Sequence, residues 1–239
     1  MKESINNIKE EGFVKLEDNE YYEIRMQYPL LNMKNAERDC IVRKSVQDML
    51  ISAVKKLPDG YKICIYDAWR PLALQQELYE SYKNAIIKEF ELENKSEQER
   101  NAVITQFVSM PSIDPNNPPI HTTGGAVDVT IIDSDGLEID MGTCFDEFTE
   151  KTRTLYFEEL LKDSVNSSST LSSSISREKA LAIIKNRRLL YDTMTSVGFT
   201  NLSSEWWHYD FGDKLWASIT GNITLYSGFF SKEEIFYIE

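Results

Sequence analysis

Residues 125–132, GAVDVTII, form an apolar run that carries a single carboxylate, Asp128. Valine, isoleucine and threonine favour the pleated surface of a buried strand. An ionised aspartate in such a run is costly unless it is paired or bound to a cation. We therefore expect a buried strand in which Asp128 has a charged or metallic partner.

Helical signals lie on both sides of this strand. Apolar residues recur at spacings of three and four over residues 43–57, which predicts a helix. Pro71 is expected to open a long helix, and a capping box at Ser96 predicts another that reaches about residue 110. A further helix is expected over 177–197.

Strand signals complete the pattern. Residues 61–66 alternate and are expected to form a strand, and residues 137–141 are expected to pair with 125–132 across the turn DSDG. We predict a single α+β domain over residues 1–239, with a mainly antiparallel central sheet flanked by helices. The serine-rich stretch 164–176 is expected to be a loop or insertion.

Charge and composition limit the partners of this chain. Its 239 residues carry 39 acidic against 26 basic side chains, a net charge of -13, which disfavours nucleic acid and anionic membranes. No basic and apolar leader and no run of 18 apolar residues occurs, so we expect a cytoplasmic protein. The three cysteines are far apart and are expected to be reduced thiols.

The chain has only two histidines, and each lies beside a carboxylate. His121 opens HTTGGAVD (121–128), where two glycines would let the backbone fold the histidine back over the strand. His208 lies in EWWHYD (205–210) with Glu205. Taken alone, the first segment is more often a loop histidine beside a turn-proximal aspartate. The second, taken alone, could equally be a strand that packs its tryptophans in the core.

The two segments together point to metal chemistry. Two neutral imidazoles and one carboxylate leave a fourth position open for water, which is the usual composition of a catalytic zinc site. A second carboxylate would remain as general base. Glu205 and His208 would face opposite sides of a regular strand, so aiming both at one site requires a bulge or a twist at the strand end.

Arg70 ends the segment DAWRP (67–71), directly after the strand expected at 61–66. An arginine at this position could stabilise an oxyanion during catalysis. Its simpler interpretation is a surface ion pair.

The motifs together resemble the D-alanyl-D-alanine dipeptidases of the VanX type, a family of zinc D,D-peptidases. The resemblance rests on H-x-x-G-x-A-x-D at 121–128, E-x-x-H within EWWHY at 205–209, DAWRP at 67–71 and MGTCFD at 141–146. It covers about residues 41–216, with the motifs in the family's order. It implies that His121, Asp128 and His208 bind one Zn²⁺ per chain, that Glu205 is the general base, and that Arg70 stabilises the tetrahedral intermediate.

The resemblance also implies a substrate. Asp146 is expected to hold the ammonium group of a small dipeptide, and we expect Trp206 and Trp207 to contact the substrate as well. The implied reaction is zinc-dependent hydrolysis of D-alanyl-D-alanine or a similar free dipeptide. The alternatives are a D,D-carboxypeptidase acting on longer cell-wall peptides, a non-haem Fe(II) oxygenase, whose metal also takes two histidines and a carboxylate, and a non-catalytic zinc-binding module.

Overall fold

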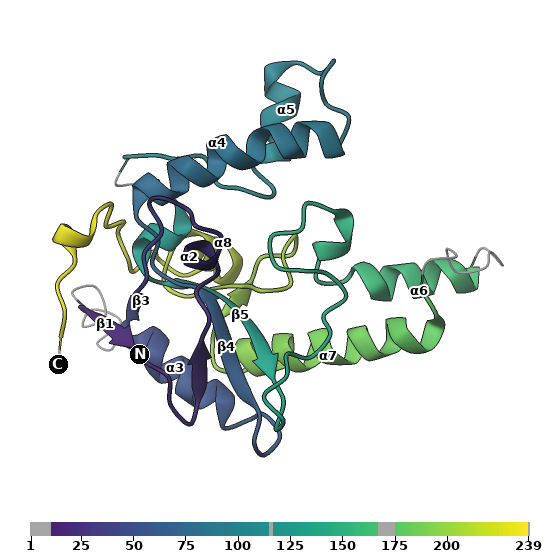
Figure 1. Ribbon diagram of the computed structural model, residues 1–239, viewed down its shortest axis with the longest axis horizontal. Helices are drawn as coiled ribbons and strands as arrows, with labels where there is room; N and C mark the ends of the chain where they lie inside the picture. The colour runs from purple at the N-terminus through teal and green to yellow at the C-terminus, as the bar shows by residue number, and fades with distance from the viewer. Residues whose placement is uncertain (1–10, 115–116, 167–174, 239) are drawn as a thin grey trace.

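The computed structural model describes residues 11–114, 117–166 and 175–238 (Figure 1). Its strands are β1 Phe13–Leu16, β2 Tyr22–Ile24, β3 Cys40–Arg43, β4 Lys62–Asp67, β5 Ala126–Ile132, β6 Thr200–Asn201 and β7 His208–Asp210. Five of them form the main sheet in the order β2-β4-β5-β7-β6, in which only the β2-β4 pair is parallel. Strands β1 and β3 form a separate antiparallel pair.

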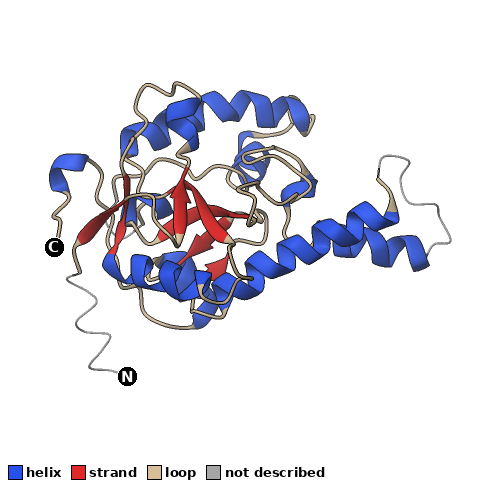
Figure 2. Cartoon of the chain, turned by 60° about the horizontal axis from the view of Figure 1, so that its bottom comes forward, coloured by secondary structure: helices blue, strands red, loops and turns tan. Residues whose placement is uncertain are grey.

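Helices surround this sheet. The α-helices are α2 Gln27–Leu30, α3 Lys44–Val54, α4 Leu72–Glu89, α5 Glu97–Ile104, α6 Tyr156–Asn166, α7 Arg177–Thr195 and α8 Lys214–Thr220. Short 3₁₀ helices are η1 Ile120–Thr123, η2 Glu150–Thr152 and η3 Lys232–Glu234. Helices α4 and α5 stand at the opposite end of the molecule from α3 and α7 (Figure 1), and α6 and α7 project together to one side (Figure 2). The expected α+β fold with a mainly antiparallel sheet is confirmed.

The two faces of β5 have different surroundings. Val127, Val129 and Ile131 point into the main hydrophobic core, which they share with Leu50 of α3 and Leu190 of α7. Because side chains alternate along a strand, Asp128 points to the opposite face. The strand is buried along its whole length, so this second face is also covered.

Most of the expected helices are present with shifted ends. The helix expected at 43–57 is α3, the long helix after Pro71 is α4, and the one expected at 177–197 is α7. The capping box at Ser96 is present, but α5 ends at Ile104 instead of near residue 110, because the chain turns there. None of the helices in the described ranges is long and apolar enough to cross a bilayer.

The prediction of a strand over residues 137–141 is wrong. The turn forms, with Asp133 N donating to Leu137 O at 2.9 Å. Pairing with β5 then stops after a single bridge at Glu138 and one hydrogen bond from Ile139 N to Ile131 O at 3.0 Å. Side chains of α7 take the next carbonyl groups, since Asn186 donates to Asp140 O and Arg187 to Met141 O, both at 2.8 Å. The expected serine-rich loop lies mostly outside the described residues, although residues 164–166 belong to α6.

Candidate active site

Three neighbouring strands bring polar side chains to one level of the sheet. Asp128 of β5 lies opposite Asp67 of β4 on one side and His208 of β7 on the other. The β4 ladder is irregular between Ile65 and Asp67, where strand β4 ends. The register therefore places a carboxylate and an imidazole beside Asp128 on the face that points away from the core.

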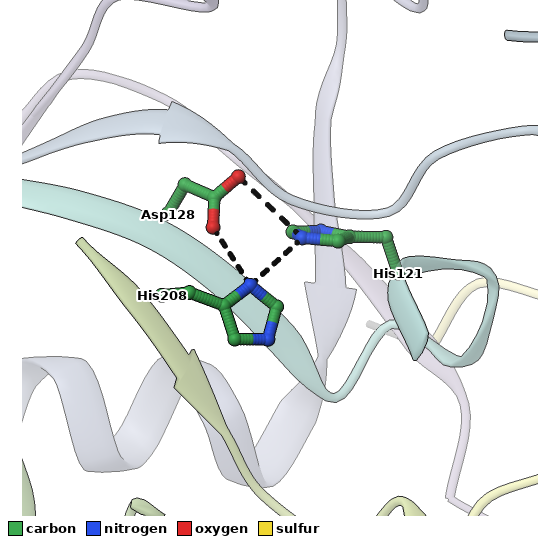
Figure 3. A group of neighbouring side chains, drawn as sticks. All are labelled: His121, Asp128 and His208. Atoms are coloured by element: carbon green, nitrogen blue, oxygen red, sulfur yellow. Dashed lines mark hydrogen bonds and ion pairs between the residues drawn. The ribbon is translucent and has the colours of Figure 1, made fainter. Parts of the chain in front are cut away.

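His121 reaches the same place from the 3₁₀ helix η1. Gly124 follows this helix in the left-handed conformation, with φ of 71°, and its N–H donates to His121 O at 3.2 Å. A Cβ on Gly125 would lie 2.2 Å from Phe211 O, so only glycine allows this approach of the two backbones. The chain thus folds back as expected and carries His121 over β5 (Figure 3).

The two histidines and Asp128 form a compact buried triad (Figure 3). His208 Nδ1 lies 2.9 Å from Asp128 Oδ1 and 3.2 Å from His121 Nε2. His121 Nε2 lies 3.4 Å from Asp128 Oδ2. One ligand atom from each residue falls within 4.8 Å of the others, a spacing that a single metal ion can bridge.

The outward nitrogens of both rings have partners that assign their tautomers. His121 Nδ1 lies 2.8 Å from the carbonyl oxygen of Ala68, and His208 Nε2 lies 2.8 Å from Asp210 Oδ1. Both partners are acceptors, so each outward nitrogen carries a hydrogen. The inward Nδ1 of His208 also faces an acceptor, Asp128 Oδ1. Burial acts to lower the pKa of His208, but Asp210 and Asp128 outweigh it and raise that pKa well above its usual range, so Nδ1 holds a proton when no metal is bound. A cation that displaced this proton would meet two imidazole lone pairs and a carboxylate, which suits metal binding.

Asp128 keeps its charge in spite of its burial. Burial acts to raise the pKa of Asp128, but the adjacent His121 and His208 outweigh it and hold that pKa below the usual range. An ionised carboxylate is the form that binds a metal.

Glu205 lies beside the triad without belonging to it. Its Oε2 is 4.0 Å from His208 Nδ1, and burial raises the pKa of Glu205 to about 8. The residue precedes β7, where Asn201 Nδ2 donates to Glu205 O at 3.0 Å and to His208 O at 2.9 Å. This bent approach to the strand supplies the twist that lets Glu205 and His208 share one site.

Arg70 is buried, with 7% of its surface exposed, so it is not a surface ion pair. Its Nε donates to Asp67 Oδ2 at 2.9 Å, its Nη1 to Gln75 Oε1 at 2.9 Å and its Nη2 to Tyr28 Oη at 3.1 Å. Nη2 is also 3.7 Å from Asp128 Oδ2. The guanidinium is therefore held rigidly at the edge of the triad.

Asp146 lies on the loop before α6 and has a φ of 55°. Its Oδ2 accepts hydrogen bonds from Tyr28 Oη at 2.8 Å and Tyr82 Oη at 3.1 Å. Burial raises the pKa of Asp146 to about 6, although the charge of Arg70 acts in the other direction.

A cavity of about 450 Å³ joins these groups. The triad residues, Arg70, Glu205 and Asp146 all line it. Its other walls include side chains of α2, α4 and α8 and of residues 105–109 after α5. The size suits a small ligand.

The structure does not bring the two tryptophans to this cavity. Trp206 and Trp207 are 3% and 2% exposed and belong to the main core. Trp206 Nε1 donates to Thr143 Oγ1 at 2.8 Å, and the Trp207 ring meets Phe145 edge-on. Neither side chain lines the cavity.

Several residues of the site were not foreseen. Tyr28 and Tyr82 bind Asp146 from positions 118 and 64 residues away, and no local pattern announces such a pairing. Asp210 lies within EWWHYD, close to the predicted ligand His208, and Asp67 lies within DAWRP, close to Arg70. This closeness in sequence is the one signal that could have identified the two aspartates.

Comparison with known proteins places the chain in a family. The sequence profile of the D-ala-D-ala dipeptidases, a group within peptidase family M15, matches residues 22–225. The chain belongs to this family. The matched span contains every residue that lines the cavity.

Two relatives are named D-alanyl-D-alanine dipeptidase. The protein from Synechocystis sp. is 28% identical over 223 residues, which are 90% of this chain and 84% of the relative. The protein from Escherichia coli is 26% identical over 172 residues, which are 72% of this chain and 66% of the relative. Membership of the dipeptidase family makes this chain a peptidase.

Proposed function

We propose that this chain is a zinc-dependent dipeptidase that hydrolyses D-alanyl-D-alanine or a similar free dipeptide. The observation that carries the proposal is the convergence of His121 Nε2, His208 Nδ1 and the Asp128 carboxylate in a cavity that Glu205 also lines. The names of the relatives support the choice of substrate.

His121, Asp128 and His208 would hold the zinc ion. When bound, zinc polarises the scissile carbonyl and lowers the pKa of a coordinated water to about 7. Ala68 O and Asp210 would keep both imidazole rings in the tautomer and orientation that this role requires.

Glu205 would act as the general base. It would take a proton from the attacking water and pass it to the leaving amine. Its carboxylate lies 4.0 Å from His208 Nδ1, beside the proposed metal ligands and in the same cavity, which suits a group that exchanges protons there.

Arg70 would stabilise the negative charge that develops on the carbonyl oxygen. The guanidinium stays charged at every relevant pH, and Asp67, Gln75 and Tyr28 hold it in place before the reaction begins. A cation fixed in advance stabilises a transition state without reorganisation.

Asp146 would bind the ammonium group of the substrate. An acylated or longer peptide lacks that group, so the buried Asp146 charge would lose its cationic partner and keep only the hydroxyl groups of Tyr28 and Tyr82. Such a loss costs about 1–3 kcal/mol or more. This requirement favours a dipeptidase over a carboxypeptidase. Free D-alanyl-D-alanine is made inside the cell, and we propose the cytoplasm as the place of action.

The remaining alternatives explain less of the site. An Fe(II) oxygenase would use the same three ligands but would give Glu205 and Arg70 no role. A non-catalytic zinc module would have no need of either residue.

The test is a comparison of kcat/KM for D-Ala-D-Ala, L-Ala-L-Ala and N-acetyl-D-Ala-D-Ala with zinc present. We expect hydrolysis of the free D,D-dipeptide and little or no hydrolysis of the acetylated form. Equal rates on the free and acetylated peptides would instead support the carboxypeptidase. No hydrolysis of any peptide would contradict the proposal.

A further inference from the structure

The cavity has a lysine in its wall whose position is fixed by a buried helix cap. Asp213 Oδ1 accepts hydrogen bonds from Leu215 N and Trp216 N, both at 2.9 Å, and Asp213 itself is fully buried. Lys214 is therefore the first residue of α8, and its side chain lines the cavity.

The basic side chains in the cavity wall are few. Apart from the two histidines, the residues that line it include Arg70 and Lys214 as their basic members. Arg70 is already bound by Asp67, Gln75 and Tyr28. The hydrogen-bond acceptor of Lys214 Nζ is the neutral side-chain amide of Asn117. An ammonium group has three donors, so Lys214 can bind a second acceptor.

Lys214 and Asp146 lie in different parts of the cavity. Asp146 binds the hydroxyl groups of Tyr28 in α2 and Tyr82 in α4. Lys214 instead begins α8 and binds the side chain of Asn117. The cavity thus presents a negative group in one region and a positive group in another.

A free dipeptide carries the complementary pair of charges. Its ammonium and carboxylate are separated by at most about 7 Å of extended chain, from about 3.3–3.6 Å per residue. The protein has a net charge of -13, which repels a carboxylate unless a local cation attracts it. Burial also lowers the pKa of the half-buried Lys214, and a bound anion would compensate for this partial desolvation.

We propose that Lys214 binds the terminal carboxylate of the substrate and makes the enzyme select dipeptides with a free carboxyl end. This inference rests on the proposed dipeptidase function. Lys214 determines specificity by binding and takes no part in bond cleavage.

The test removes the charge of Lys214 and keeps a polar side chain that is one atom shorter. In Lys214→Gln we expect KM for D-Ala-D-Ala to rise by about tenfold, which corresponds to about 1.4 kcal/mol, with kcat changed much less. KM for the C-terminal amide, D-Ala-D-Ala-NH₂, should change by less than about twofold, because the amide has no charge for Lys214 to bind. Lys214→Arg should restore most of the preference for the free acid.

The matched control is Lys56→Gln, since Lys56 is exposed in the turn after α3 and is not part of the cavity wall. It should leave both KM values unchanged. If Lys214→Gln and the wild type discriminate equally between the acid and the amide, the role of Lys214 is refuted while the dipeptidase function stands.

A binding measurement separates this inference from the proposed function. Calorimetry in the Glu205→Gln background gives Kd for both peptides without turnover. Binding of the acid that weakens about tenfold on Lys214→Gln supports the inference even if the wild type cleaves neither peptide, which would refute the function alone. If the protein with Lys214 intact binds the acid and the amide equally, or binds neither peptide, the assignment of Lys214 is overturned.

Discussion

Each histidine of this chain turns one ring nitrogen outward to a supporting partner and the other inward to Asp128. The outward nitrogens of His121 and His208 lie against Ala68 O and Asp210, and the inward nitrogens face Asp128. The supporting partners matter because they fix which nitrogen carries the hydrogen. The chain has only two histidines, so the proposed metal site would use both of its imidazoles.

Glu205 is expected to act on protons and not to bind the metal. Glu205→Gln should keep one metal per chain, because the three ligands remain, while kcat falls by roughly 10²-fold or more, the contribution of positioned proton transfer. Metal analysis and steady-state kinetics on the same sample test both parts.

The control for this variant is Glu93→Gln, an exposed glutamate that does not line the cavity. Glu93→Gln should change neither the metal content nor kcat. Loss of metal in Glu205→Gln would make Glu205 a ligand.

We expect the buried charge of Asp146 to lower the free energy of unfolding, while the same charge serves substrate binding. Its pKa of about 6 is above the ordinary value for aspartate, so the folded state binds a proton more tightly than the unfolded state. The group therefore favours folding at low pH, and this contribution is lost as pH rises through about 6. Asp146→Asn should raise the free energy of unfolding at pH 7 by about 1–3 kcal/mol.

Urea unfolding of chelator-treated protein measures this effect without the field of a metal ion. The advantage of Asp146→Asn should shrink as pH falls from 7 towards 4. A variant that is less stable than the wild type at pH 7, by an amount independent of pH, would show that Asp146 is not a costly buried charge.

The sequence revealed the site residues that lie in short motifs and missed those that act from a distance. His121 and Asp128 share one octapeptide, and Glu205 and His208 share another. The support of Asp146 by Tyr28 is different, because it depends on how α2 packs against a loop 118 residues later. Packing of this kind has no local signature in a single sequence.

Among the elements, β5 and its neighbours set the geometry of the site. Asp128 and His208 meet because β5 and β7 are in register, and Phe211 N donates to Gly125 O at 3.0 Å just beyond that pair. A small displacement of β7 would therefore move His208 away from Asp128.

Gly125→Ala tests this dependence. The new Cβ would lie 2.2 Å from the backbone oxygen of Phe211, so β5 and β7 must separate. We expect a loss of about 1–3 kcal/mol in stability, the usual cost of overpacking, together with weaker metal binding. Thermal unfolding and zinc titration measure the two effects.

Gly136→Ala is the matched control. Gly136 has a φ of +79° but no atom within 4 Å of a Cβ, so alanine there adds backbone strain of about 1 kcal/mol and leaves the site alone. Equal zinc affinity in both variants would contradict the role of the β5-β7 register.

Elements with strong local signals were predictable and those that depend on partners were not. The periodic apolar residues of α7 and the buried run of β5 identify these elements without knowledge of the fold. Residues 137–141 carried a valid hairpin signal, but Asn186 and Arg187 of α7 bind carbonyl groups that a strand would need. No pattern within 137–141 could reveal that competition.

In the whole molecule, two layers of helices leave a cavity on the face of the sheet opposite the core. Helices α3 and α7 pack against the core face, and α2, α4, α8 and the turn after α5 contribute to the cavity wall. The site is thus assembled from segments spread between residues 28 and 218. Because these segments meet only in the folded chain, activity requires that the whole domain is folded.

Zinc titration of the metal-free protein is the most direct test of the proposed activity. Protein treated with a chelator should not hydrolyse D-Ala-D-Ala, and activity should rise linearly with added zinc and reach its plateau at one equivalent per chain. His208→Ala should bind no zinc at that concentration and stay inactive. Full activity in the chelated protein, or in His208→Ala, would contradict a zinc dipeptidase built on His121, Asp128 and His208.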